Sequence, residues 1–387
     1  MGHCNTIFHQ VLRLLDRHDF RKIEQDRFRP KRKCRSLSRW GLFVVMMFAQ
    51  ITGRASLREI VQQFEFHATK LYHLGVDLVK RTTLADANSR RPAAFFEALF
   101  QHQYAKCAAI APSKKFRFKN KLYSFDSTVI DLCLSLFPWA KFRTTKGGIK
   151  LHTLVDHDGY IPAFIEITAA KVADLTVAKL LTLPAFSIVV IDRAYVDFAW
   201  LYKLTQRNIF FVTRMKRGIK TRVVNRDPVL IAKGVTSDQT IELTGPKGKH
   251  CPIQLRRVGY RDGETGQHYV FLTNISHLSA RTIADIYRER WKVELFFKWI
   301  KQNLKIKSFL GTSRNAVMTQ IWIAIITLLL LAYYKFRAKL GHSLSQILKL
   351  LQLNLFSRRN IWHLFDPEPT ECMMPNRDPL LMNFGHL

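Results

Sequence analysis

The sequence predicts a mixed α/β protein, in which a sheet carries helices on its faces, a β-rich insertion interrupts it and a helical region precedes it. Three patterns predict this class. KLYSFDSTVIDL and GIKLHTLVDHDGYIPAFIEIT read as three consecutive antiparallel strands, the last two joined by a turn at 157–159. VADLTVAKLL, FSIVVID, DFAWLYKLTQRN and IFFVTRMK then alternate helix and strand, which is typical of parallel sheets. Turn-rich, β-like sequence follows before helical periodicity returns at Ser279.

These patterns divide the chain into five parts. In the first part, GLFVVMMFAQ and SLREIVQQFE are two expected helices separated by Thr52–Arg54, with Ser56 as an N-cap. Together with the basic run Arg21–Arg39, they fit a small DNA-binding domain or an ordinary helical bundle. The five parts are an N-terminal helical DNA-binding domain at 1–75, a helical connector at 76–118, a split catalytic core at 119–217 and 279–337, a β insertion at 218–278 and a C-terminal helical tail at 338–387. The Pro-rich end of the tail, DPEPTECMMPNRDPL, is expected to be loosely ordered.

The net charge narrows the choice of partner. With 61 Lys and Arg against 29 Asp and Glu, the chain carries +32 at pH 7, which indicates a polyanion such as nucleic acid or a membrane surface. The six cysteines form no CxxC pair, and the start MGHCNTIFHQ lacks the layout of a secretory signal. We therefore expect a reduced, cytoplasmic protein.

One segment raises the membrane alternative. IWIAIITLLLLAYY, residues 321–334, is almost wholly apolar and approaches the ~20 residues that a membrane span needs. A single segment of borderline length in so charged a chain favours a buried core helix and no membrane. A membrane-associated protein remains the less favoured alternative.

A second segment, YRERWKVELFFKWIKQNLK at 287–305, predicts one continuous, largely buried helix. At about 100° per residue, Glu294 is the only acid on a narrow polar stripe, and Glu289 faces the opposite side. A buried carboxylate needs a cation, hydrogen bonds or a metal. Glu294 therefore either forms a structural ion pair with Arg290 or Lys298, or meets other carboxylates at a metal site.

Two aspartates are candidates to join Glu294. Asp126 lies within the first expected strand, and Asp192 ends the apolar strand FSIVVID. Sites gather at the carboxyl ends of parallel strands, so an acid that ends an apolar strand is well placed for one. Three carboxylates on rigid elements suit one or two Mg²⁺ or Mn²⁺ ions, which can support phosphoryl transfer.

Several motifs resemble a known family. The run Tyr287-x2-Arg290-x3-Glu294-x6-Lys301 resembles the Tyr-Arg-Glu-Lys signature of bacterial insertion-sequence transposases with an Asp-Asp-Glu site. The surroundings of both aspartates match as well: Asp126-Ser127-Thr128, KGGIKLHTLVDHDGYIP and Asp192-Arg193-Ala194-Tyr195.

The resemblance implies a ribonuclease H-like core whose third carboxylate follows the β insertion. Asp126, Asp192 and Glu294 would be the catalytic residues and would bind Mg²⁺ or Mn²⁺, two ions in all. Tyr287, Arg290 and Lys301 would hold terminal DNA phosphates. The implied function is a transposase that binds its element's terminal inverted repeats, cuts at the ends and joins the 3′-hydroxyls to target DNA. Synapsis of two ends implies at least a homodimer on the DNA.

Two positions differ from the relatives. Ala194 stands where they carry Gly, which would strain the backbone if φ were positive there, and the run Ile167–Lys171 lacks an expected Asp-Gly. A catalytically impaired, DNA-binding relic or repressor is therefore the alternative function.

The remaining candidates have two interpretations each. Lys298, Arg214 and Lys216 are expected to contact DNA, although the last two also fit a basic loop. His152 could assist near Asp126, but a structural, hydrogen-bonded histidine is favoured. Trp291 and Trp299 could stack on an unpaired base, but core packing is favoured for both.

Overall fold

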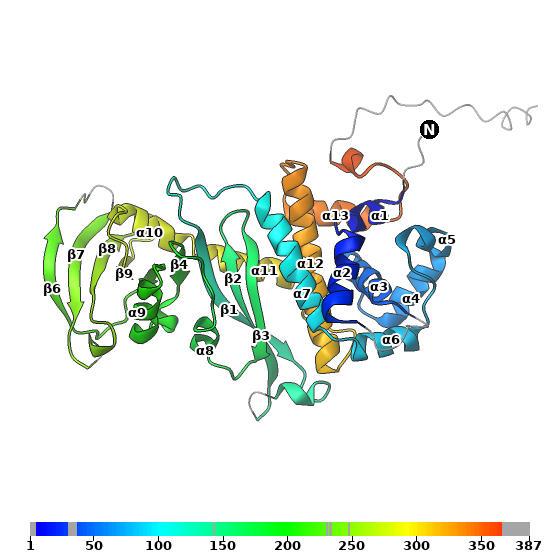
Figure 1. The fold of residues 1–387 in the computed structure, drawn as a ribbon, viewed down its shortest axis with the longest axis horizontal. Coiled ribbons are helices and arrows are strands. Elements are labelled where there is room, and N and C mark those ends of the chain that lie inside the picture. Colours follow the sequence, from blue (N-terminus) through cyan, green and yellow to red (C-terminus); the bar gives the residue numbers. More distant parts are fainter. Residues whose placement is uncertain are drawn as a thin grey trace, which may run out of the picture.

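The computed structural model describes residues 5–29, 37–141, 144–229, 231, 234–246 and 248–365. Within these ranges nine strands form one mixed sheet, in the order β3-β2-β1-β4-β5-β9-β8-β7-β6 (Figure 1). The strands are β1 Leu122–Leu132, β2 Gly147–Asp156, β3 Ile161–Ala169, β4 Ile188–Ile191, β5 Phe210–Arg214, β6 Thr221–Asp227, β7 Val235–Leu243, β8 Gln254–Arg261 and β9 His268–Thr273.

The first five strands have the predicted connectivity. β1, β2 and β3 pair antiparallel in succession, whereas β4 pairs parallel with both β1 and β5. The α/β class expected from the sequence is therefore confirmed. The β-rich insertion continues this sheet, because β9 pairs antiparallel with β5 and is followed by β8, β7 and β6.

Strand β4 shows why its sequence is apolar throughout. Ile188 and Val190 face a cluster that includes α10 (Ala280–Arg288), while Val189 and Ile191 face a cluster that includes α8 (Asp174–Ala178) and α9 (Phe198–Gln206). Successive side chains of a strand point to opposite faces, so a strand covered on both sides must be apolar at every position. Packing on both faces therefore holds β4 rigidly up to its end, which Asp192 directly follows.

The apolar segment at 321–334 lies within α12, Arg314–Arg337, and is the core helix that the sequence favoured. α12 is long and apolar enough to cross a membrane, but 89% of its most apolar window is buried inside the protein. It packs against α7 (Ala94–Ala109) and α3 (Arg39–Thr52), and its cluster reaches β2 and β3 (Figure 1). Contacts on all sides explain why this helix has no polar face.

The N-terminal helices share this core. The caps expected from the sequence are present: the Ser56 side chain accepts from the Glu59 backbone N–H, and Gly53 ends α3 in the left-handed conformation. Arg21–Arg27 of the basic run lies in α2, whereas residues 30–36 and the Pro-rich C-terminal end from 366 lie outside the described residues. The other helices here are α1 Ile7–Leu12, α2 Arg17–Arg27, α4 Leu57–Phe66, α5 Ala68–Leu71, η1 Tyr72–Leu74, α6 Arg81–Arg90, α13 Leu344–Asn354 and η6 Ile361–Leu364.

The prediction of one continuous helix over 287–305 is wrong. Ser279 caps α10 as expected, but α10 ends at Arg288 and α11 is Trp291–Asn303. Between them the backbone tightens, because the Arg290 N–H donates to the Tyr287 carbonyl and the Lys292 N–H to the Glu289 carbonyl, both over 3.0 Å.

Glu289 occupies this junction and is only 5% exposed. It accepts a hydrogen bond of 3.0 Å from the Tyr160 hydroxyl and forms an ion pair with Lys115. These bonds lower the pKa of Glu289 in spite of its burial. Glu289 is therefore an anchor of the junction, whereas the Glu294 side chain is 35% exposed.

The burial of α12 can be tested by matched leucine substitutions. Leu329→Ala removes a fully buried side chain of α12, whereas Leu353→Ala removes one on α13 that is 83% exposed. We expect Leu329→Ala to lower the free energy of unfolding by about 2 to 5 kcal/mol and Leu353→Ala by less than about 0.5 kcal/mol. Urea unfolding followed by circular dichroism measures both, and equal losses would contradict the core position of α12.

Candidate active site

Asp126 and Asp192 come from neighbouring parallel strands. Asp126 lies within β1, and Asp192 directly follows β4. The register pairs Phe125 with Ile191, so the two aspartates stand at the same level of the sheet. Since Phe125 and Ile191 both face the α8 and α9 cluster, strand alternation directs the aspartates to the α10 and α11 side.

Arg290 connects two of the three carboxylates. Its guanidinium donates to Asp126 Oδ2 over 3.2 Å and to Glu294 Oε1 over 2.7 Å. The ion pair between Arg290 and Glu294, one of the two interpretations of the sequence, is therefore present. It coexists with the approach of Glu294 to Asp126 and so does not exclude the other interpretation.

The three carboxylates interact electrostatically. Burial, together with the charges of Glu294 and Asp192, raises the pKa of Asp126 to about 6, against the opposing effects of the Ser127 N–H and Arg290. Asp192 Oδ1 is buried and has no hydrogen-bond partner among the described residues. A buried, unpartnered carboxylate oxygen beside two further carboxylates fits a divalent cation.

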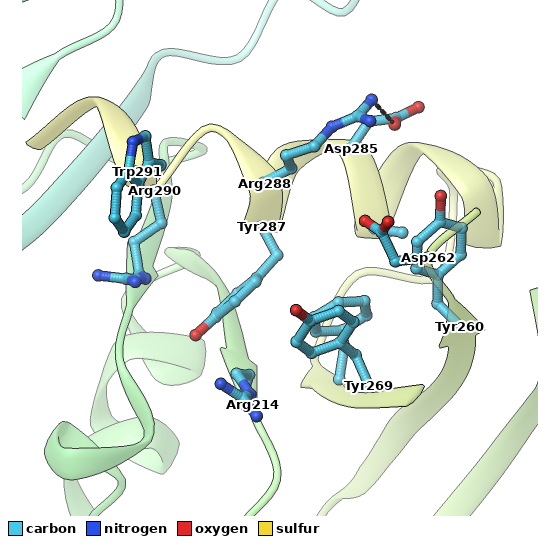
Figure 2. A pocket seen from close by; sticks show the side chains of 11 residues that line it. Arg214, Tyr260, Asp262, Tyr269, Asp285, Tyr287, Arg288, Arg290 and Trp291 are labelled. Atoms are coloured by element: carbon cyan, nitrogen blue, oxygen red, sulfur yellow. Dashed lines mark hydrogen bonds and ion pairs between the residues drawn. The ribbon is translucent and has the colours of Figure 1, made fainter. Parts of the chain in front are cut away.

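A cavity of about 280 Å³ adjoins Arg290 (Figure 2). The Tyr287 ring packs 4.9 Å from that of Phe271, and its hydroxyl, which is buried without a described partner, points toward the space between Arg290 and Arg214 (Figure 2). Arg214 stacks 4.9 Å from the Tyr269 ring. The full lining is Arg214, Tyr260, Asp262, Tyr269, Phe271, Ala284, Asp285, Tyr287, Arg288, Arg290 and Trp291.

Lys301 lies further along α11 and β1. Its Nζ donates to Thr128 Oγ1 over 2.6 Å and to the Val129 carbonyl over 2.9 Å. Burial and the nearby Lys307 lower its pKa. Lys301 of α11 therefore contacts β1 at Thr128, two residues beyond Asp126, while Lys298 is exposed on α11.

Comparison with known proteins identifies the family. Residues 117–330 match the transposase DDE domain family, and residues 3–77 match a family described only as a domain of unknown function. The chain is a DDE-domain transposase. It is 33% identical over 315 residues to a Sinorhizobium fredii protein named as a transposase, covering 79% of this chain and 86% of that one. It is 30% identical over 292 residues to a Geobacillus stearothermophilus protein named as a transposase for the insertion sequence element IS5377, covering 72% and 76%.

The solved structures include a distant neighbour. A piggyBac transposase synaptic complex with hairpin DNA superposes with a TM-score of 0.46 at 11% identity, covering 93% of this chain and 80% of that chain. The family and the strand order β3-β2-β1-β4-β5 confirm the resemblance to insertion-sequence transposases and the ribonuclease H-like core.

The transposase brings most of the proposed site residues together. The three carboxylates Asp126, Asp192 and Glu294 lie together. Arg290 bonds two of them, and Tyr287 and Arg214 line the same cavity as Arg290. Lys216 does not lie beside the carboxylates. Its Nζ donates to the Val196 carbonyl over 3.2 Å, and the residue lines a different cavity together with Asp197 and His250. β5 ends at Arg214, two residues before Lys216, and no local sequence pattern indicates which of these two cations faces the carboxylates.

Two further groups contact the site and were not singled out from the sequence. The Tyr195 hydroxyl lies 3.5 Å from Asp126 Oδ1. Ser127 Oγ donates to Asp174 Oδ1 over 2.7 Å, and Lys150 forms an ion pair with Asp174 over 3.1 Å. Tyr195 could have been found as the last residue of the Asp192-Arg193-Ala194-Tyr195 motif, but Asp174 carried no such signal.

His152 has the structural role that was favoured. Its Nε2 shares a hydrogen bond of 2.9 Å with Thr168 Oγ1, and the side chain is fully buried. Burial lowers its pKa to about 4, so the imidazole is neutral at physiological pH.

The tryptophans differ from each other. Trp299 is half-buried and donates to Ser345 Oγ over 2.9 Å. Trp291 is 56% exposed at the rim of the cavity (Figure 2), so core packing was the wrong expectation for it. The junction between α10 and α11 turns Trp291 outward.

Ala194 imposes no strain. It lies in the 3₁₀ turn η3, Arg193–Tyr195, and is absent from the described non-glycine residues with positive φ, which are Tyr160, Phe186, Asn208 and Lys339. The backbone argument for an impaired transposase is therefore removed at this position.

The raised pKa of Asp126 predicts a stability profile. The folded protein holds this proton up to a pKa of about 6, whereas an unfolded Asp releases it near ~3.9, so the parent loses stability as pH rises through that window. In the absence of divalent metal, we expect the free energy of unfolding of Asp126→Asn to be about 1 to 3 kcal/mol higher than that of the parent at about pH 8.

This difference should shrink toward about pH 4, as urea unfolding at several pH values would measure. A pH-independent difference, or a variant that is less stable at about pH 8, would contradict the electrostatic conflict at Asp126.

Proposed function

We propose that this transposase binds the terminal inverted repeats of its own element, cleaves the DNA at the element ends and joins the freed 3′-hydroxyls to target DNA. Cleavage is hydrolysis at phosphorus, and joining is a transesterification at the same kind of centre. The transposase acts in the bacterial cytoplasm on double-stranded DNA.

The observation that carries this proposal is the convergence of Asp126, Asp192 and Glu294 from β1, β4 and α11. Asp126 responds to the charge of both other carboxylates. Basic and aromatic side chains border the same place, and the chain carries +32 overall. Carboxylates beside a phosphate-binding surface support phosphoryl transfer on DNA.

The cofactor proposed is Mg²⁺ or Mn²⁺, with two ions held by Asp126, Asp192 and Glu294. Carboxylate oxygens are the ligands that these ions prefer, and Asp192 Oδ1 is buried without a described partner. When bound, such ions lower the pKa of a water and neutralise charge on phosphate oxygens. Among the described residues no group of three ligands is close enough to hold a metal as it stands, and Arg290 is bonded to both Asp126 and Glu294.

Arg290 is proposed to exchange its two carboxylate partners for a DNA phosphate. In the free protein it neutralises Asp126 and Glu294. Once metal neutralises those carboxylates, the planar guanidinium is available for a terminal phosphate, which it can bind with two parallel N–H donors. Arg290 would thus hold the site together without DNA and position the DNA when it arrives.

Tyr287 and Lys301 are proposed to hold the neighbouring phosphates, with Lys298 and Arg214 as further DNA contacts. The Tyr287 hydroxyl lacks a described partner and points toward the Arg290 side of the cavity (Figure 2). An unpaired base at the element end could stack on the exposed Trp291 ring. Two ends must be held at once, so we infer a homodimer in the synaptic complex.

The carboxylates can be tested by isosteric substitutions. We expect Asp126→Asn, Asp192→Asn and Glu294→Gln each to lower cleavage of element-end DNA by at least about 1000-fold in Mg²⁺ or Mn²⁺, because each removes a proposed metal ligand. Glu264→Gln, in an exposed turn of the insertion, is the control and should cleave like the parent. If any of the three site variants cleaves like the parent, the assignment of that residue fails.

The role of Lys301 predicts a salt effect. Lys301→Ala should weaken binding to element-end DNA and reduce the slope of log affinity against log salt by about 0.9, the value for one phosphate contact. Lys349→Ala, an exposed cation on α13, is the matched control. Binding measured by fluorescence anisotropy at several salt concentrations would show an unchanged slope if Lys301 serves only to bond Thr128.

A further inference from the structure

The segment from Ser113 to Lys121 is the most basic described connector near the active site. It reads SKKFRFKNK, with five cations and no acid, and joins α7 to β1 without regular secondary structure. Figure 1 shows it crossing from the end of α7 to the start of β1. None of the ion pairs of these cations involves Asp126, Asp192 or Glu294.

The connector alternates between half-buried and exposed side chains. Phe116 and Phe118 stack with ring centroids 5.1 Å apart and pack against the cluster that contains Tyr287. Lys115, Arg117 and Lys119 alternate with them and are exposed.

The connector is tied down along its length. The Lys114 N–H donates to Asp158 Oδ1 over 2.8 Å, and Lys121 Nζ donates to Asp158 Oδ2 over 2.6 Å. Lys115 forms its ion pair with Glu289, which directly precedes Arg290. The row of cations therefore has a fixed position relative to the catalytic carboxylates, unlike a freely moving charged loop.

Two of the exposed cations have no anion to neutralise. Within the described residues, neither Arg117 nor Lys119 has a hydrogen-bond or ion-pair partner. Lys115 and Lys121 are committed to Glu289 and to Asp156 and Asp158. Arg117 and Lys119 are thus available to an external polyanion.

We propose that Arg117 and Lys119 bind the phosphate backbone of the target DNA. This proposal rests on the proposed function. The element end is assigned to Tyr287, Arg290 and Lys301, and Lys301 contacts β1 at Thr128 and Val129, beyond Asp126. The connector instead precedes β1, which begins at Leu122, and so lies at the other end of that strand. From Lys115 to Lys119 the fully exposed side chains are all cations, and phosphate contacts carry no sequence information. A sequence-independent surface suits target DNA better than the terminal repeats.

The test compares two doubly substituted proteins. Arg117→Ala/Lys119→Ala removes the proposed contacts, and Lys203→Ala/Arg207→Ala removes two exposed cations of the α9 region as a matched control. Each is incubated with pre-cleaved element ends, Mg²⁺ and a target plasmid. At a fixed salt concentration, strand transfer by the first variant should be about 10-fold lower than that of the parent. The slope of log affinity against log salt on unrelated duplex DNA should be smaller in magnitude by about 1.8. The control should match the parent.

Cleavage of intact element ends provides the second readout. The proposal holds if strand transfer falls much more than end cleavage, and Arg117→Glu/Lys119→Glu should deepen that difference. It is overturned if strand transfer equals that of the parent, or if cleavage and strand transfer fall equally, which would assign the connector to the element end. If the parent cleaves no element end, the proposed function fails, while the slope on unrelated DNA still tests the connector.

Discussion

The structure around the site depends on the bond that Arg290 makes to Asp126 and Glu294. Three carboxylates cannot share a partly buried place without a counter-charge, because burial and mutual repulsion both disfavour their ionised forms. Arg290 supplies that charge and at the same time links the central strand β1 to α11. Its own position depends on the junction at Glu289, whose bonds to Tyr160 and Lys115 set where α10 stops and α11 starts.

The sheet supplies the rigidity that this arrangement needs. β4 is buried on both faces, so Asp192 leaves it from a fixed position, and the parallel pairing with β1 sets Asp126 at the same level. The insertion adds to the site as well as to the sheet. Because β9 pairs with β5, the aromatic side chains Tyr269 and Phe271 come to lie beside Arg214 and Tyr287 and form a wall of the cavity.

The same residues serve stability and chemistry in opposite ways. The raised pKa of Asp126 means that its charge is unfavourable in the folded protein without a cation to balance it. A site of this kind is destabilising until its ligands arrive, as expected where function and stability make different demands. Burial of α12 and the shared core of the N-terminal helices provide the compensating stability.

Local patterns in the sequence determined the strands, the apolar character of β4 and α12, and the three acids, because each depends on residues close together in the chain. The resemblance in the Tyr-Arg-Glu-Lys spacing assigned roles to the acids and cations. Only the tertiary structure decided the break between α10 and α11, the burial of Glu289 and the exposure of Trp291. These depend on Lys115 and Tyr160, which lie far from residue 289 in the chain, and periodicity within one helix contains no information about such partners. For the same reason, only long-range pairing of β9 with β5 decided that Arg214 joins the site and Lys216 does not.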